Sequence, residues 1–311
     1  MRIGIDIMGG DFAPQTTTEG AILAQKELSN VELVLIGDES KILPILEEKG
    51  ADKSQFSIVH TPEVIGMGEH PIKAFKSKPK SSIGLGFHLL ASDEIQGFAG
   101  AGNTGAMMIG SMYSVKPIPG IIRPCITSIL PKENGGVNLI LDVGVNADCK
   151  PDVLYQFGVV GSIYAQNVLG IKNPRIGLLN IGEEPEKGNL LSQATFNLMK
   201  DSKEFDFVGN IEGRDLFDDK CDVMVCDGFT GNVVLKEAEA FYHLMKKRGI
   251  LDEYFSRFNY EIYGGSPILG INSNVVVGHG ISNDVAIKNM IKLTAECIEA
   301  NLSNKITEAF K

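Results

Sequence analysis

The stretch from Cys226 to Lys236, "CDGFTGNVVLK", combines residue types that suit the binding of an anion. It begins at the end of a run typical of a buried strand and continues into the pattern of a helix. Glycine lets the backbone come close to a ligand, and the first turn of a helix offers free N–H groups and a partial positive charge. The junction therefore predicts half of an anion site. The residues expected to contact the anion are Asp227, Gly228, Thr230 and Gly231.

A second glycine-rich turn, "GAGNTG" from Gly100 to Gly105, also stands between an expected strand and an expected helix. Dinucleotide sites share this pattern and add an acidic residue about 20 residues further on, which holds the ribose. No Asp or Glu occurs from Ala106 to Lys132, which disfavours a nicotinamide site. A turn that cradles phosphate and a purely structural turn both remain open. On the first interpretation, the contacts come from Gly102, Asn103, Thr104 and Gly105.

Three further side chains have both a functional and a structural interpretation. Lys187, in "EKGN", either binds an anion or is a solvated charge, and its surroundings lack the residue order of a P-loop. Cys149 fits a small filler of a turn better than an activated thiol. His279, in "GHGIS", either contacts a ligand or has a structural role.

These residues need a frame that brings them together, and the hydrophobic pattern predicts one. Short β-branched runs alternate with longer helical ones. Strands are expected at 2–8, 31–37, 56–60, 96–100, 137–142, 175–180, 205–209, 222–226 and 274–278. Helices are expected at 14–28, 81–92, 103–114, 151–169, 188–200 and 283–303. This alternation predicts an α/β fold with a doubly wound, mostly parallel sheet and helices on both faces. Ligands bind such sheets beyond the carboxyl ends of the strands, where the glycine-rich turns stand.

The composition narrows the class of protein. A formal net charge of −10 disfavours a nucleic-acid binder, which needs a basic face to offset the repulsion of phosphates. Five cysteines without paired metal-type spacing indicate free thiols in a reducing cytosol. No targeting segment and no transmembrane span are expected. An acidic partner would need a local basic patch, and Lys73, Lys76, Lys78 and Lys80 provide one.

Motifs at the expected strand ends recur in a characteristic order. They are "DIMGGDFAP", "GNTGA", "DVGVNADCKP", "GLLNIGEEPEKGN", "GNIEGRD", "CDGFTGNVVLK", "YGGSPILG" and "HGIS". Together they resemble the PlsX family, the phosphate acyltransferases that use acylated acyl carrier protein in bacterial phospholipid synthesis. The resemblance spans nearly the whole chain.

The resemblance implies transfer of a fatty acyl group from acyl carrier protein to inorganic phosphate. It implies a fold similar to phosphate acetyltransferases and isocitrate dehydrogenases, and a cytoplasmic homodimer associated peripherally with the membrane. Neither a cofactor nor a metal is implied. Because phosphate is itself the nucleophile in this reaction, no Ser or Cys nucleophile is needed. The alternatives are a nicotinamide-dependent oxidoreductase of related fold and a non-catalytic scaffold for the carrier protein or membrane.

The resemblance also assigns roles to individual residues. Lys187 would orient phosphate and offset its charge, and Asn232 would donate its amide to phosphate or to the oxyanion. His279 and Ser282 would complete the phosphate contacts, although Ile281 stands where the family usually has a serine. We expect a single catalytic domain over residues 1–311.

The segment 237–262 is shorter than the helical hairpin of the family, and we expect a mobile helical element there. Residues 238, 241, 242 and 245 place apolar side chains on one stripe of this element. Such a stripe suits either a membrane contact or a dimer helix.

Overall fold

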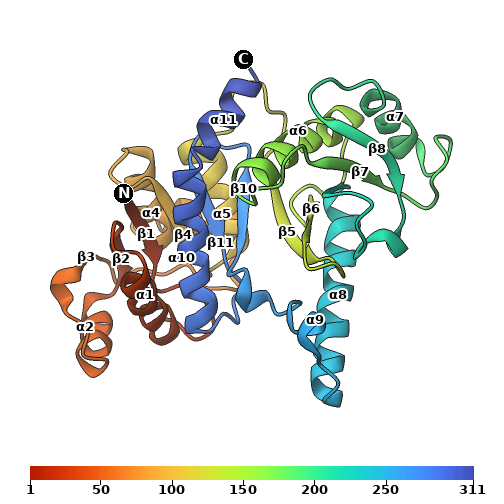
Figure 1. Ribbon diagram of the computed structural model, residues 1–311. Helices are drawn as coiled ribbons and strands as arrows, with labels where there is room; N and C mark the ends of the chain where they lie inside the picture. The colour runs from red at the N-terminus through yellow and green to blue at the C-terminus, as the bar shows by residue number, and fades with distance from the viewer. The chain divides into compact units, whose positions relative to one another are not determined.

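The computed structural model describes residues 1–311 and divides the chain into two compact units. The first unit combines Met1–Ile118 with Tyr260–Asn304, and the second combines Pro119–Asn259 with Lys305–Lys311 (Figure 1). Whether the two units act as the single catalytic domain expected for residues 1–311 stays a prediction.

The first unit is built on a sheet with the strand order β3-β2-β1-β4-β11-β10. The bounds of its strands are β1 (Arg2–Asp6), β2 (Glu32–Gly37), β3 (Phe56–His60), β4 (Gly97–Gly100), β10 (Ser266–Leu269) and β11 (Asn274–Val277). Neighbouring strands from β3 to β11 run parallel, and β10 pairs with β11 antiparallel. The carboxyl ends of β1, β4 and β11 therefore meet at one edge of this sheet.

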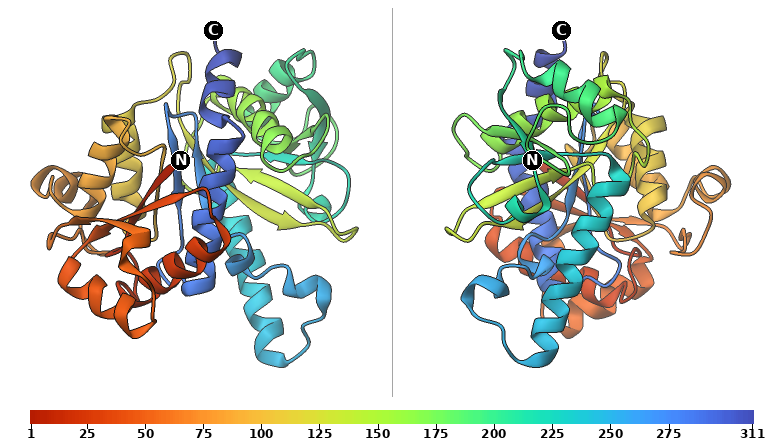
Figure 2. Two further views of the ribbon diagram at one scale, coloured as in Figure 1. Left: turned by 60° about the vertical axis from the view of Figure 1, so that its left-hand side comes forward. Right: turned by 90° about the vertical axis from the view of Figure 1, so that its right-hand side faces the viewer.

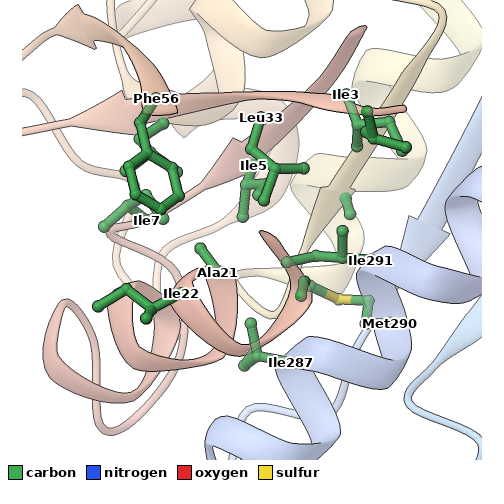
Figure 3. Close-up of a cluster of buried hydrophobic side chains, with 14 of the residues drawn as sticks. Ile3, Ile5, Ile7, Ala21, Ile22, Leu33, Phe56, Ile287, Met290 and Ile291 are labelled. Atoms are coloured by element: carbon green, nitrogen blue, oxygen red, sulfur yellow. The ribbon is translucent and has the colours of Figure 1, made fainter. Parts of the chain in front are cut away.

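Helices cover both faces of this sheet, as expected. Their bounds are α1 (Gln15–Glu27), α2 (Glu39–Glu48), α3 (Pro71–Ser77), α4 (Ser82–Ala91), α5 (Thr104–Gly110) and α10 (Asp284–Glu299), with short turns at η1 (Lys53–Gln55), η2 (Ser111–Val115) and η4 (Tyr260–Ile262). Figure 3 shows Ile3 and Ile5 of β1, and Ile7 just after it, in one apolar cluster with side chains of α1 and α10. On the opposite face, the rings of Phe87 in α4 and Phe98 in β4 lie 5.2 Å apart.

The second unit has its own sheet, with the strand order β5-β6-β9-β7-β8. Its elements are β5 (Cys125–Pro131), β6 (Val137–Leu141), α6 (Pro151–Asn167), β7 (Arg175–Leu179), α7 (Leu190–Met199), β8 (Asp206–Ile211), η3 (Gly213–Asp215), β9 (Val223–Val225), α8 (Gly228–Arg248) and α9 (Glu253–Ser256). The strands β6, β9, β7 and β8 run parallel, and β5 is antiparallel to β6. The chain ends in α11 (Leu302–Ala309).

The α/β class and the mostly parallel pairing are confirmed, but β5 and β10 are missing from the predicted strands. Both are antiparallel additions to a parallel sheet and both contain proline, at Pro131 and Pro267. Proline lacks the N–H that a strand needs for its ladder, so these segments carry the sequence signals of a turn.

The segment 237–262 is largely helical. It contains the second half of α8, which ends at Gly249 in the left-handed conformation (φ 68°), and it contains all of α9. Figure 2 shows this half of α8 extending away from the sheet of its own unit. The mobility of the segment stays a prediction.

Candidate active site

Three strand-end loops of the first unit come together at the carboxyl edge of its sheet. The N–H of Asp11, after β1, donates to the carbonyl of Gly280, after β11, at 2.7 Å. The N–H of Gly278 donates to the carbonyl of Gly100, at the end of β4, at 2.9 Å. These contacts hold Gly100 and Ala101 beside Gly278, and Gly102 of "GAGNTG" lies against Gly9 of the loop after β1.

Asn103 organises this edge through its side chain. Its Oδ1 accepts the N–H of Ala106 at 3.0 Å and so caps α5. Its Nδ2 donates to the carbonyls of Gly66, Met67 and Glu69 at 2.9–3.2 Å. The amide that was expected to contact phosphate is thus already used to order a neighbouring loop. Thr104 is exposed in the first turn of α5, and Gly105 follows it.

His279 and Ser282 occupy the third loop. The ring of His279 packs against Tyr260 with a centroid distance of 4.8 Å. The N–H of Ser282 donates to the carbonyl of His279 at 3.0 Å, and the Ser282 hydroxyl is buried without a hydrogen-bond partner. A buried hydroxyl that lacks a partner favours a role in binding a ligand.

Asp6, at the end of β1, lies beneath these loops. Its carboxylate is 1% exposed and lies against the backbones of Gly9 and Gly102. Oδ1 accepts the N–H of Met8 at 3.1 Å, and Oδ2 is buried beside Gly9 and Gly102. Burial raises the pKa of Asp6 to about 6, although the Ser82 hydroxyl and the backbone N–H groups of Met8 and Gly9 oppose the shift.

In the second unit, Asp227 begins α8. Its carboxylate accepts the N–H of Thr230 at 2.8 Å and the Thr230 hydroxyl at 3.0 Å, which is the geometry of an N-cap. A side chain at Gly231 would collide with the carbonyl of Asp142, and one at Gly228 would reach 2.7 Å from the Asp142 carboxylate. Both glycines are therefore required for the first turn of α8 to pack against the loop after β6.

Asp142 anchors that loop. It accepts the N–H groups of Ile126, Val145 and Asn146 at 2.6–3.1 Å, and the Asn146 side chain at 3.0 Å. Burial raises the pKa of Asp142, although these donors oppose the shift. Asn232, one helical turn into α8, is half-buried and donates to the carbonyl of Val143 at 3.1 Å. The position of Asn232 is therefore set by the Asp142 loop.

Lys187 lies on the loop between β7 and α7. The Asn180 side chain donates to its carbonyl at 3.2 Å, and the Lys187 N–H donates to the carbonyl of Glu184 at 3.0 Å. Gly188 has φ +87°, and a side chain there would collide with Asn180, so glycine is needed for this turn. The Lys187 ammonium is exposed and forms no salt bridge, which leaves its charge available to a ligand.

A pocket of about 300 Å³ lies within the second unit where this loop meets the start of α8. It is bordered by Gly188 and Asn189 on one side and by Asp227 and Thr230 on the other. No cluster of three or more metal-ligating side chains is present. None of the helices has the length and apolar character needed to cross a bilayer.

Comparison with known proteins identifies the family. The family model described as "Fatty acid synthesis protein" matches residues 1–305. A phosphate acyltransferase from Halothermothrix orenii is 41% identical over 328 residues, which cover 99% of this chain and 98% of that protein. A phosphate acyltransferase from Dictyoglomus thermophilum is 42% identical over 327 residues, which cover 99% of this chain and 97% of that protein. The chain belongs to this family. The resemblance drawn from the strand-end motifs is confirmed.

Solved structures show where the fold of this family recurs. A phosphotransacetylase from Streptococcus pyogenes has a TM-score of 0.67 at 16% identity, covering 97% of this chain and 94% of that one. A branched-chain phosphotransacylase from Enterococcus faecalis has a TM-score of 0.61 at 14% identity, and the match covers 96% of this chain and 98% of that one. A putative 4-hydroxythreonine-4-phosphate dehydrogenase from Salmonella typhimurium has a TM-score of 0.57 at 14% identity, and the match covers 95% of this chain and 98% of that one. The expected likeness to phosphate acetyltransferase folds is confirmed.

In this family member, the predicted site residues form two sets. The first unit brings Gly102, Asn103, His279 and Ser282 to one sheet edge. The second places the loop of Lys187 and the start of α8, at Asp227 and Thr230, around one pocket, and Asn232 follows within the first turns of α8. Their roles in catalysis stay predictions.

Sequence reasoning missed the residues beneath these loops. Asp6 is the last residue of β1, and Asp142 directly follows β6. Both belong to the strand-end motifs, "DIMGGDFAP" and "DVGVNADCKP". The signal was an acidic residue at a strand end followed closely by glycine. Their burial depends on packing between distant segments, which the motifs do not encode.

Proposed function

We propose that this protein transfers a fatty acyl group from the thioester of an acyl carrier protein to inorganic phosphate. A phosphate oxygen forms a bond to the thioester carbonyl carbon, the carbon–sulfur bond breaks, and the carrier thiolate leaves and takes up a proton. The products are acyl phosphate and free carrier thiol. The match of residues 1–305 to the family carries the proposal.

The chemistry asks the protein to hold a dianion near the thioester and to stabilise the oxyanion that forms. The exposed, unpaired ammonium of Lys187 is suited to the phosphate charge. Asn232 uses one of its two amide hydrogens for Val143, so the other is available to the oxyanion or to phosphate. No thiol nucleophile is required, and burial raises the pKa of Cys149 to about 12, which keeps that thiol protonated.

The turns of the first unit, taken by themselves, carry the other candidate phosphate contacts. The buried Ser282 hydroxyl lacks a partner in the protein, and the backbones of Gly102, Thr104 and Gly105 lie on the same edge. Asn103 is assigned a supporting role, because its donors already bind three carbonyls.

The acyl carrier protein, which is acidic, is proposed to dock on α3 and the residues after it. Lys73, Lys76 and Lys80 are exposed there and form no salt bridge. Lys78 differs, because its ammonium binds Glu69 at 2.5 Å and the carbonyl of Val64 at 2.8 Å. The docking charge is therefore assigned to the other three lysines.

Homodimer formation and peripheral membrane contact are also part of the proposal. The stripe predicted at 238, 241, 242 and 245 does not face outward as a whole, since Ala238 and Tyr242 are buried. Phe241 and Leu244 are exposed instead, near three basic residues in the last turn of α8. An exposed apolar face flanked by basic residues suits either contact.

Trapping of the product tests the proposed reaction. The protein is incubated with acylated carrier and phosphate, and the remaining acylated carrier is removed because its thioester also reacts with hydroxylamine. Hydroxylamine then converts any acyl phosphate to a hydroxamate. We expect hydroxamate only when phosphate and protein are both present. Carrier thiol released equally without phosphate would indicate a thioesterase. A parallel fluorescence titration with a reduced nicotinamide cofactor should show no saturable binding, and saturable binding would favour the oxidoreductase alternative.

A further inference from the structure

The pocket of the second unit has walls that are mainly aliphatic. Five side chains from four segments line it: Leu154 from α6, Leu178 and Leu179 from β7, Ile181 from the following loop, and Leu191 from α7. Leu154 and Leu178 are almost fully buried, whereas Leu179 and Leu191 are half-buried. Its volume of about 300 Å³ lies at the small end of the range of ligand pockets.

The polar residues that line this pocket offer little to a polar ligand. Asn180 accepts the N–H of Ile181 at 2.9 Å and donates to the carbonyl of Lys187. Asn189 accepts the N–H and the hydroxyl of Ser192 at 2.8 and 3.0 Å. The Asp227 carboxylate likewise accepts the N–H and the hydroxyl of Thr230. Because these groups serve the turns and helix caps, the surface left for a ligand is apolar.

Two aliphatic side chains extend this apolar surface outward. Ile181, in the loop before Lys187, is 81% exposed, and Leu190, the first residue of α7 after it, is 86% exposed. Large aliphatic side chains at such exposure lose stabilisation unless something covers them. Here the uncovered apolar groups and the unpaired ammonium belong to one short segment.

We propose that this pocket binds the fatty acyl chain of the thioester, with Ile181 and Leu190 covering the part of the chain that emerges. The inference rests on the proposed acyl transfer and adds the site that selects chain length. The ligand that fits is a flexible hydrocarbon tail with a polar head, since an apolar pocket adjoins a cation. With the tail inside, the carbonyl lies toward the start of α8, where Asn232 and the α8 N-terminus stand.

Filling the pocket provides the test. Leu191→Trp introduces bulk into the pocket, and Leu198→Trp adds the same bulk about two turns further along α7, where Leu198 is exposed and does not line the pocket. Each methylene that is excluded should lower affinity about fourfold. We expect Leu191→Trp to raise KM for palmitoyl-carrier protein about tenfold or more and for octanoyl-carrier protein less than about twofold. In Leu191→Trp, KM for phosphate should stay unchanged. Leu198→Trp should have the same KM values as the natural protein for both acylated carriers and for phosphate.

A second variant and a direct binding measurement separate this inference from the proposed reaction. Leu191→Ala enlarges the pocket and should shift preference toward longer chains. Binding of cis-parinaric acid, a fluorescent fatty acid, should be lost in Leu191→Trp and kept in Leu198→Trp. If the natural protein transfers acyl groups but all variants share one chain-length profile, the pocket assignment is wrong. If it transfers none, the reaction fails, and fatty acid binding alone decides the pocket.

Discussion

Lys187 and Asn232 occupy different structural settings, and their substitutions should differ accordingly. We expect Lys187→Ala and Asn232→Ala each to lower kcat about 10²–10³-fold, the usual loss when one donor to a developing charge is removed. Lys187→Ala should also raise KM for phosphate. Its stability should change by less than about 0.5 kcal/mol, because the side chain is exposed and unpaired. Asn232→Ala should cost about 1 kcal/mol, because it removes a hydrogen bond to Val143.

A control for Lys187 lies at the other end of the same strand, in the segment before β7. Lys172 is equally exposed and unpaired, but it precedes β7, whereas Lys187 follows it. Steady-state kinetics should show near-natural kcat and KM for Lys172→Ala. Equal losses in both lysine variants would mean that net charge, and not the position of Lys187, supports the reaction.

Asp6 carries a prediction about pH. Its pKa is about 6 in the folded protein and 3.8 in the unfolded chain, so its contribution to stability is full below pH 3.8 and is lost as pH rises through about 6. Asp6→Asn removes the buried charge but keeps the acceptor for Met8. At pH 8 the variant should be more stable by up to about 3 kcal/mol, and at pH 4 the difference should be small. Urea unfolding at both pH values measures this, and an equal effect at both would contradict it.

At the scale of elements, the sequence predicts most helices and strands but little of the packing that forms the pocket. The pattern around Asp227 and Gly231 predicts a helix start, because an N-cap and a close glycine are local features. The pocket needs Leu154 beside Leu191, which come from two helices separated by a strand, and no local pattern encodes that contact. Likewise, Asn103 was expected to contact phosphate, but its side-chain amide donates to a loop that lies more than 30 residues earlier.

A charged network stabilises the opposite edge of the second sheet. Asp222, just before β9, accepts the Lys132 ammonium at 2.6 Å, and the N–H and Nε of Arg175 at 2.9 Å each. Burial alone would raise the pKa of Asp222, but the hydrogen bonds from Arg175 and Lys132 outweigh it and hold the pKa well below its usual value. The contribution of Asp222 to the free energy of unfolding is therefore full above the unfolded pKa of 3.8, and it is lost as the pH falls below that value.

Breaking this network should be costly. Lys132 has a side chain only 4% exposed, so Asp222→Asn leaves a buried cation with reduced compensation. Urea unfolding at pH 7 should show a loss of about 3–5 kcal/mol. Lys236→Gln, which breaks the exposed pair with Glu239, should cost less than about 1 kcal/mol. Similar small losses for both variants would show that the network contributes little.

At the scale of the whole molecule, a net charge of −10 means that an acidic carrier must find a local basic surface. Lys73→Glu combined with Lys76→Glu should raise KM for acylated carrier about tenfold or more at low salt and flatten its dependence on salt, with kcat nearly unchanged. The control is Lys26→Glu combined with Lys53→Glu, which changes net charge equally at exposed sites elsewhere. Equal effects of both pairs would show that overall repulsion, and not α3, governs docking.

The central claim is that phosphate is the nucleophile, so that every acyl group leaving the carrier reaches phosphate. Phosphorus NMR can follow acyl phosphate while a thiol reagent counts free carrier in the same reaction. The account predicts that the two products appear at equal rates and in equal amounts, and that both vanish without phosphate. Thiol release that continues without phosphate, with no acyl phosphate signal, would contradict it.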